Sequence, residues 1–186
     1  CIQNQLTTLD VSSCFSLNYL ECGGNDLTSL NVSGLSALTL LTCTSNNLST
    51  IDVSTCTSLQ ILNCGYNQLT SIDISACSSV YSLDCEFNPQ LTFINIKNNS
   101  PFNAFTGSSF EFNDCPSIQF ICTDENKMQM IQQKITNYGY SNCNVNTYCS
   151  FTPGGSFYEV SGNTKFDSNN NGCDVSDINF NNLQYN

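Results

Sequence analysis

The amino-acid sequence predicts a mainly-β solenoid, a fold in which short coils of the chain stack on one another and share one core. Three observations lead to this fold class. The motif Cys-x-x-Asn returns at a constant spacing, apolar residues recur at fixed places between the motifs, and polar and apolar residues alternate within each unit. The motif begins at Cys1, Cys22, Cys43, Cys64 and Cys85. One unit cannot bury its own apolar face, so we expect neighbouring units to cover it.

The repeated unit of twenty-one residues has the form L-x-x-L-x-C-x-x-N-x-L-T-x-L-D-V-S-x-C-x-x. Its beginning matches the signature of a leucine-rich repeat, with Cys in the third apolar place. So short a unit has no room for an outer α-helix, and we expect a parallel β ladder on one side of the solenoid and a second ladder or an irregular extended run opposite. The recurring Asn falls where the chain turns, and an inward Asn can hydrogen-bond backbone groups that the turn leaves unpaired.

The regular repeat breaks towards the C-terminal end of the solenoid. We interpret residues 97–114 as an insertion, because units of the same period can be aligned again beyond it. The alignment places Ile121 in the apolar column of Leu20 and leaves Cys122 pointing outward. The predicted leucine-rich-repeat solenoid therefore occupies residues 1–122.

The residues after the solenoid predict a C-terminal cap with one helix, spanning 123–150. Apolar and aromatic residues fall on one helical stripe there: Met128, Ile131, Ile135 and Tyr138. We expect the helix to cover the open end of the core, and recruitment of a partner by this helix is the alternative. Residues 151–186 contain a Pro-Gly-Gly linker signal and are interpreted as a linker and the start of a truncated β domain.

Composition and charge exclude several classes of function. The chain has four Lys, no Arg, no His and a formal net charge of -11. The lack of His excludes Ser-His-Asp triads, Cys-His dyads and His-ligated zinc, and the acidic balance opposes binding to nucleic acid. No apolar run approaches the ~20 residues that a membrane helix needs, so we expect no direct membrane insertion.

The outward side chains of the predicted ladder and its turns are candidate ligand-binding positions. They include aromatic, aliphatic and acidic residues: Tyr19, Glu21, Leu40, Ile61, Tyr66, Asp84, Glu86 and Phe87. An exposed stripe of this kind is compatible with partner binding, whereas the plainer interpretation is that these residues solvate the sheet. Asp52 with Asp73, or Asp84 with Glu86, also resembles the paired carboxylates of glycosidases. A flat solenoid offers no deep pocket, so we expect no enzyme.

A loop near the C-terminus has the oxygen-rich spacing of a calcium site. Side-chain oxygens at positions 1, 3 and 5 and Gly at position 6 correspond to the first half of an EF-hand-type loop, and two further acids follow. The candidate calcium ligands are Asp167, Asn169, Asn171, Asp174 and Asp177. Glu is missing at position 12, and an Asn- and Gly-rich hairpin turn is the alternative.

Together these features resemble the leucine-rich-repeat region of secreted cell-surface proteins of Bacteroidota, especially flavobacteria. The resemblance rests on the unit N-x-L-T-S-I-D-I-S-x-C-x-S-V-x-S-L-D-C at 67–85 and on the cap sequences between Ile121 and Ser150. Residues 157–177 resemble the start of the β-sandwich that often follows such repeats. The resemblance implies export by the type IX secretion machinery, a place on the outer cell surface, and a protein that is adhesive or has an unknown ligand.

Two groups of cysteines can be distinguished by their place in the repeat. Most of the thirteen lie in two repeat columns, where Cys either serves as a small apolar residue or forms disulfides between coils. Cys122, Cys143 and Cys149 lie outside the columns, and the export that the resemblance implies permits a disulfide among them. We predict that Cys122 pairs with Cys143 and pins the cap, and free thiols are the alternative.

The sequence therefore predicts an extracellular recognition or adhesion module that binds protein or glycan through the solenoid surface. The alternative is a structural spacer, without a ligand of its own, in a large surface adhesin or filament. An adhesion module should carry a varied, aromatic-bearing patch on one face, whereas a spacer should carry uniform polar faces.

Overall fold

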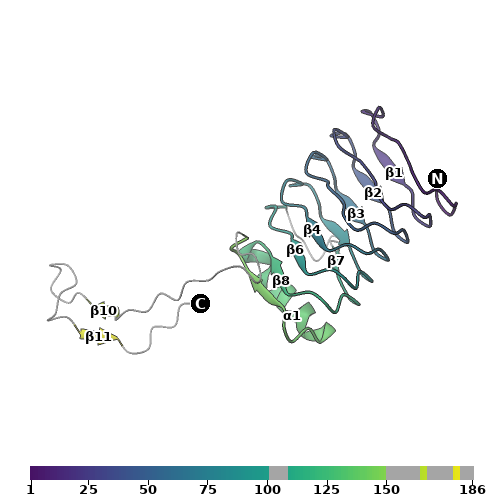
Figure 1. Ribbon diagram of the computed structural model, residues 1–186. Coiled ribbons are helices and arrows are strands. Elements are labelled where there is room, and N and C mark those ends of the chain that lie inside the picture. Colours follow the sequence, from purple (N-terminus) through teal and green to yellow (C-terminus); the bar gives the residue numbers. More distant parts are fainter. Residues whose placement is uncertain (101–108, 150–163, 167–177, 181–186) are drawn as a thin grey trace. The chain divides into compact units, whose positions relative to one another are not determined.

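The computed structural model describes residues 1–100 and 109–149, together with the strands Thr164–Phe166 and Ile178–Phe180. The chain divides into two compact units, Cys1–Pro153 and Gly154–Asn186. The first unit is a solenoid of stacked coils (Figure 1). Its described strands form two parallel sheets, and one short helix precedes the last of these strands, which is the arrangement expected for leucine-rich repeats with a helical cap.

The first sheet contains five parallel strands. Their order across the sheet is β1 (Tyr19–Glu21), β2 (Leu40–Thr42), β3 (Ile61–Asn63), β5 (Ser82–Asp84) and β7 (Ser109–Glu111). Leu20 pairs with Leu41, and Leu41 pairs with Leu62, so the register here advances by one repeat unit from coil to coil. The middle residue of each strand is buried and its two neighbours face outward, because successive side chains of a strand point to opposite faces.

The second sheet contains four parallel strands from the later coils and the cap. They are β4 (Ser71–Asp73), β6 (Phe93–Asn95), β8 (Phe120–Cys122) and β9 (Asn144–Asn146). In the earlier coils the residues equivalent to β4, around Leu30 and Ile51, lie outside any strand. Both forms expected for this side of the solenoid are therefore present, an irregular run at the N-terminal end and a ladder at the C-terminal end.

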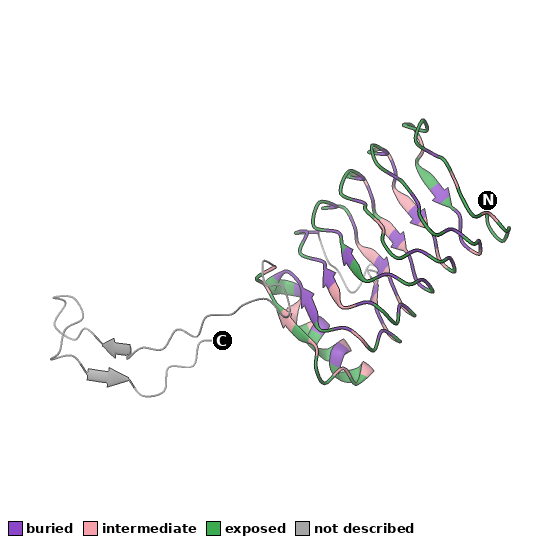
Figure 2. Ribbon diagram, viewed as in Figure 1, coloured by how far each residue is buried: buried purple, intermediate pink, exposed green. Residues whose placement is uncertain are grey.

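The core consists of repeat columns that stack along the solenoid (Figure 2). Each column places the same kind of side chain in successive coils. Fully or almost fully buried members include Leu20, Leu41, Leu62, Leu83, Cys22, Cys43, Cys64, Cys85, Leu27, Leu48 and Leu69. Burying a Leu side chain contributes about 1.5–3 kcal/mol, so each coil is stabilised mainly by the coils on either side of it.

A ladder of buried Asn side chains joins neighbouring coils. The Oδ1 atom of Asn67 accepts a hydrogen bond from the N–H of Leu48 at 3.0 Å, and its Nδ2 donates to the carbonyl oxygens of Cys43 at 3.0 Å and Cys64 at 3.1 Å. Equivalent bonds are made by Asn25, Asn46 and Asn88. The ladder thus pairs the backbone groups of the turns, as the sequence predicts.

The predicted insertion at 97–114 is wrong in part, because its end forms a strand of the first sheet. Phe110 pairs with Leu83, and the two residues are further apart in the sequence than one regular repeat unit. The side chain of Phe110 is buried. Ile121, expected in the column of Leu20, instead pairs with Ile94 in the second sheet. The prediction from the sequence is wrong here because a longer coil breaks the repeat period and Phe replaces Leu at the inward position.

The cap begins with a 3-10 turn, η2 (Glu125–Lys127), and continues as helix α1 (Met128–Tyr138). Gly139 ends the helix in the left-handed conformation, with φ of 75°. Ile131 and Ile135 are buried, and the ring of Tyr138 meets that of Phe112 edge-on at 5.2 Å between centroids. Ile131, Ile135 and Tyr138 of the predicted stripe therefore pack against the end of the core, and Met130 takes part there in place of the predicted Met128. In the part of the chain that the structure describes, no helix has the length and apolar character needed to cross a lipid bilayer.

The second unit is described at two strands, β10 (Thr164–Phe166) and β11 (Ile178–Phe180). They pair antiparallel, with Lys165 opposite Asn179. The predicted linker and the remainder of the β domain predicted for 151–186 lie outside the described residues.

Candidate functional site

Three of the candidate residues form one outward column on the first sheet. Tyr19 pairs with Leu40, and Leu40 pairs with Ile61, so the three side chains project from the same face of β1, β2 and β3. Tyr19 is 69% exposed, and the other two are partly buried. The column continues as Ser82 on β5, so its apolar part covers the N-terminal half of the sheet.

Glu21 and Asp84 belong to a second outward column, but two strands separate them. This column runs from Glu21 on β1 through Thr42 and Asn63 to Asp84 on β5. Its last member is Glu111 on β7, which the sequence reading missed because it lies in the stretch interpreted as an insertion. The Glu111 carboxylate accepts hydrogen bonds from Lys134 Nζ at 2.9 Å and from the Tyr138 hydroxyl at 2.6 Å, so it is held by the cap helix.

Tyr66 and Phe87 form a stacked aromatic pair in the turns beside this sheet. Their ring centroids lie 4.3 Å apart at an interplanar angle of 16°, and both side chains remain exposed. Both residues have left-handed backbones, with φ of 54° and 51°, at a position that Gly24 occupies in an earlier coil. A non-glycine residue in this conformation costs about 1–2 kcal/mol. Ser45 has the same left-handed backbone at this position in the coil before Tyr66.

Two carboxylates adjoin the aromatic pair. The Oδ1 atom of Asp84 accepts a hydrogen bond from the N–H of Glu86 at 3.1 Å. Gly65 leaves room for both side chains, since a Cβ atom there would lie 3.2 Å from Asp84 Oδ1 and 3.2 Å from Glu86 Cγ. We call Tyr66, Phe87, Asp84 and Glu86 the acidic aromatic patch.

Two side chains of the acidic aromatic patch, Asp84 and Tyr66, have raised pKa values. Partial burial raises the pKa of Asp84, although the hydrogen bond from the N–H of Glu86 lowers it. The negative charges of Glu86 and Glu111 also raise the pKa of Asp84. Partial burial, followed by the charges of Glu86 and Asp114, also raises the pKa of Tyr66. The structure therefore brings four of the predicted site residues into one negatively charged cluster, away from Tyr19 and Glu21 at the other end of the sheet.

The other predicted carboxylate pair lies on the opposite side of the solenoid. Asp52 and Asp73 line a shallow hollow of about 260 Å³ between two coils. Each carboxylate accepts a hydrogen bond from a backbone N–H two residues on, at 2.9 Å from Ser54 and 2.8 Å from Ser75. The hydrogen bonds from Ser54 lower the pKa of Asp52, which is the opposite of what a general acid at neutral pH requires.

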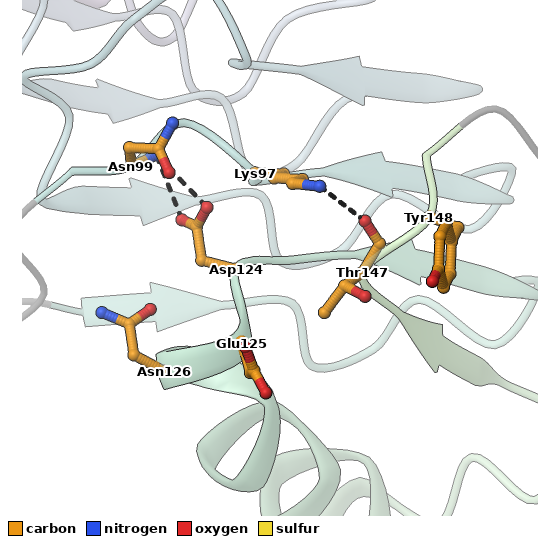
Figure 3. A pocket seen from close by; sticks show the side chains of 7 residues that line it. All are labelled: Lys97, Asn99, Asp124, Glu125, Asn126, Thr147 and Tyr148. Atoms are coloured by element: carbon orange, nitrogen blue, oxygen red, sulfur yellow. Dashed lines mark hydrogen bonds between the residues drawn. The ribbon is translucent and has the colours of Figure 1, made fainter. Parts of the chain in front are cut away.

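A polar groove near the cap was not predicted. It has a volume of about 790 Å³ and is lined by Lys97, Asn99, Asp124, Glu125, Asn126, Thr147 and Tyr148 (Figure 3). Two of its charged groups already bond within the chain: Lys97 Nζ donates to the Thr147 carbonyl at 2.7 Å, and the N–H of Asn99 donates to the Asp124 carboxylate at 3.2 Å. No local sequence pattern signals this groove, because three separate segments build it.

The cysteines of the repeat columns are free thiols in the structure. Burial raises the pKa of Cys43 to about 12 and that of Cys22 to about 11. Of the two roles considered for the column cysteines, the structure supports that of a small apolar residue, because none of these cysteines forms a disulfide between coils.

The predicted pairing of Cys122 with Cys143 is wrong. Cys122 is buried and forms a disulfide with Cys149, with Cα atoms 5.2 Å apart, while Cys143 is a free thiol. The strand register explains the difference, because Cys122 lies opposite Asn146 and the chain turns back after β9 to bring Cys149 beside it. Cys143 precedes β9 and lies three residues from that level, or about 10 Å along the strand direction.

The candidate calcium ligands lie outside the described residues. These are Asp167, Asn169, Asn171, Asp174 and Asp177. Within the described part of the chain, no group of three or more His, Cys, Asp or Glu side chains is placed to hold a metal ion.

Comparison with protein-family models gives no match, and no curated protein matches the chain. One similar solved structure is described as "Functional domain of InlJ from Listeria monocytogenes includes a cysteine ladder". The two sequences are 32% identical over an alignment that covers 65% of this chain, with a TM-score of 0.45. The alignment covers 28% of that longer chain.

Proposed function

We propose that this chain is a recognition module that binds a protein partner through the outward face of its first sheet. One observation carries the proposal: a continuous parallel ladder presents Tyr19, Leu40 and Ile61 in one column and the stacked rings of Tyr66 and Phe87 beside it. Among the described helices and strands, the main contacts of β1, β2 and β3 are with their neighbours in the same sheet.

The physical properties of this face suit binding. Aromatic side chains supply large contact areas and often dominate the energy of protein interfaces. The ladder holds them on a rigid scaffold, so little conformational entropy is lost when a partner binds. A protein surface matches the aliphatic part of the column better than a neutral glycan does, and a glycan remains the second ligand class that the experiment tests.

We propose further that the chain is not an enzyme. The carboxylates considered for glycoside cleavage support this view, because the N–H of Ser54 donates a hydrogen bond to Asp52 and hydrogen bonding to Ser54 lowers the pKa of that carboxyl. Two charged groups of the polar groove, those of Lys97 and Asp124, are likewise engaged by the chain itself.

We place the module outside the cell, as an adhesive part of a surface protein. The disulfide between Cys122 and Cys149 supports an oxidising compartment. Export by type IX secretion and an origin in Bacteroidota rest on the resemblance of the repeats alone. The spacer alternative is supported by the uniform polar character of the opposite side of the solenoid. One repeat position there is occupied by Asn31, Asp52 and Asp73 in successive units.

The test is a binding array of surface proteins and glycans probed with the full chain. Hits are measured again with Tyr19→Thr and Phe87→Ser, which remove exposed rings without opening the core. The matched control is Phe15→Ser, because Phe15 is 64% exposed but lies in the turn that precedes β1 and not in an outward column of the first sheet. We expect the first two variants to weaken binding about tenfold or more, and Phe15→Ser to leave it unchanged. Silence of the folded chain on the whole array would favour the spacer.

A further inference from the structure

The charges on the outward face of the first sheet are of one sign. Its described ionisable carboxylates are Glu21, Asp84, Glu86 and Glu111, with Asp114 in the next turn. The basic side chain nearest to them is Lys134, which is already paired with Glu111 at 2.9 Å.

The remaining lysines with described side chains are engaged elsewhere. Lys97 donates to the Thr147 carbonyl at the groove, and Lys127 is fully buried and paired with Asp124. Among the described residues, no lysine is paired with Asp84 or Glu86. The acidic aromatic patch therefore presents unneutralised carboxylates directly beside exposed ring faces.

We propose that this sheet face binds a basic segment of a protein partner, with an Arg or Lys side chain lying against the Tyr66–Phe87 stack and paired with Asp84 and Glu86. The inference rests on the proposed function and specifies the chemistry of the partner. A cation over an aromatic ring is attracted by the ring quadrupole, and Arg combines that contact with hydrogen bonds to carboxylates.

Two further properties favour a basic partner. Asp84 is half-buried, so its carboxylate has lost part of its hydration and has no cation beside it. A guanidinium or ammonium group of the partner would supply the missing cation. The net charge of -11 would also steer a positively charged partner towards the chain and raise its association rate at low salt. The apolar column of Tyr19, Leu40 and Ile61 provides contact area on the same ladder for the rest of the segment.

The experiment selects ligands from a displayed library of random linear peptides with the full chain. Each selected peptide is synthesised with a copy in which every Arg and Lys is replaced by Gln. Affinities are measured for the wild type, for Tyr66→Ala, and for the double variant Asp84→Asn/Glu86→Gln. Asn is acceptable at position 84, because Asn63 fills the same column in the preceding coil.

The control variant Asp52→Asn/Asp73→Asn removes the same amount of charge from the opposite side of the solenoid. Asn is compatible with that column too, since Asn31 there accepts the same hydrogen bond, from the N–H of Ser33 at 3.0 Å. Circular dichroism and thermal unfolding verify that all variants fold.

We expect the selected peptides to be enriched in Arg and Lys and to lose about tenfold or more in affinity in the Gln copies. Tyr66→Ala and Asp84→Asn/Glu86→Gln should cause similar losses, and Asp52→Asn/Asp73→Asn should cause none. Equal losses in both double variants would overturn the proposed site in favour of a general attraction by net charge. Peptides that need Tyr66 but bind equally well as Gln copies would overturn the basic partner and leave the proposed function standing. A library that yields no peptide dependent on this face would overturn both.

Discussion

The ammonium group of Lys127 lies 2.7 Å from the Asp124 carboxylate, and both side chains are enclosed by the cap and the last coils. Lys127 Nζ also donates to Asn98 Oδ1 at 2.9 Å and to Ser100 Oγ at 3.0 Å. A buried charge is tolerated only when it is paired and hydrogen-bonded, and this cluster meets both conditions. It joins the start of the cap to the coil that precedes β7.

Replacing Lys127 by Met should strongly destabilise the solenoid. The substitution leaves Asp124 buried without its cation, so we expect the free energy of unfolding to fall by about 3–5 kcal/mol. Urea denaturation followed by circular dichroism measures the loss. Lys134→Met is the control, because that lysine belongs to a partly exposed pair and should contribute at most about 1 kcal/mol. Similar losses in the two variants would contradict the structural role given to Lys127.

The Asn ladder gives a second prediction about stability. Asn67→Ala would leave the N–H of Leu48 and the carbonyls of Cys43 and Cys64 without their side-chain partner inside the core. We expect a loss of more than about 2 kcal/mol in the free energy of unfolding. Asn4→Ala provides the comparison, because Asn4 is exposed and its side chain bonds only to the carbonyl of Ile2 among the described residues. The change at Asn4 should stay within about 0.5 kcal/mol.

The disulfide can be tested by paired Cys→Ser variants. It closes a loop with a sequence separation of 27 residues, for which the loss of Cys149→Ser should be about 3 kcal/mol under oxidising conditions. Cys143→Ser should leave the stability nearly unchanged, since Cys143 is a free thiol. Peptide mapping without reduction should recover Cys122 linked to Cys149, and recovery of Cys122 linked to Cys143 would refute the assignment.

The buried thiols predict a loss of stability at alkaline pH. The pKa of Cys43 in the folded chain is raised to about 12 by burial, above its ordinary value of about 8.5. The folded state therefore holds this proton more tightly than the unfolded state does, so its contribution to stability is complete below about pH 8.5 and decreases as the pH rises towards 12. Unfolding curves measured between neutral and alkaline pH check this, and Cys43→Ala should make the dependence less steep, while the other buried thiols maintain part of it.

Thiol reactivity provides an independent measurement of the same burial. At pH 8 we expect iodoacetamide to modify the exposed Cys14 in the folded chain and to leave Cys43 and Cys64 unmodified. Addition of guanidinium chloride should make all three reactive. Rapid modification of Cys64 in the folded state would show that the column is open to solvent.

Much of the solenoid could be predicted from the sequence, because its constraints repeat. Leu20, Leu41 and Leu62 occupy one column since a constant period puts them opposite one another. The same regularity predicted the inward Asn residues and, with helical spacing, the buried face formed by Ile131 and Ile135.

The prediction failed where the period changes or where contacts join distant segments. The sequence around Phe110 shows no Leu or Cys at the repeat positions, so its strand was read as part of an insertion. The partner of Cys122 depends on how the chain turns after β9, which cysteine spacing does not specify. The stack of Tyr66 on Phe87 and the groove lined by Lys97 and Tyr148 likewise need three-dimensional register.

The constant step between β1, β2 and β3 has a consequence for how such a molecule changes in length. After a tandem duplication of residues 43–63, each copy would contact the same kinds of side chains that the original coil contacts. The reason is that successive coils are joined by the same Leu pairing and by the same Asn hydrogen bonds. The solenoid can therefore grow or shrink by whole coils without a new folding problem. Each added coil would lengthen the outward ladder by one strand and leave its side chains free to diversify.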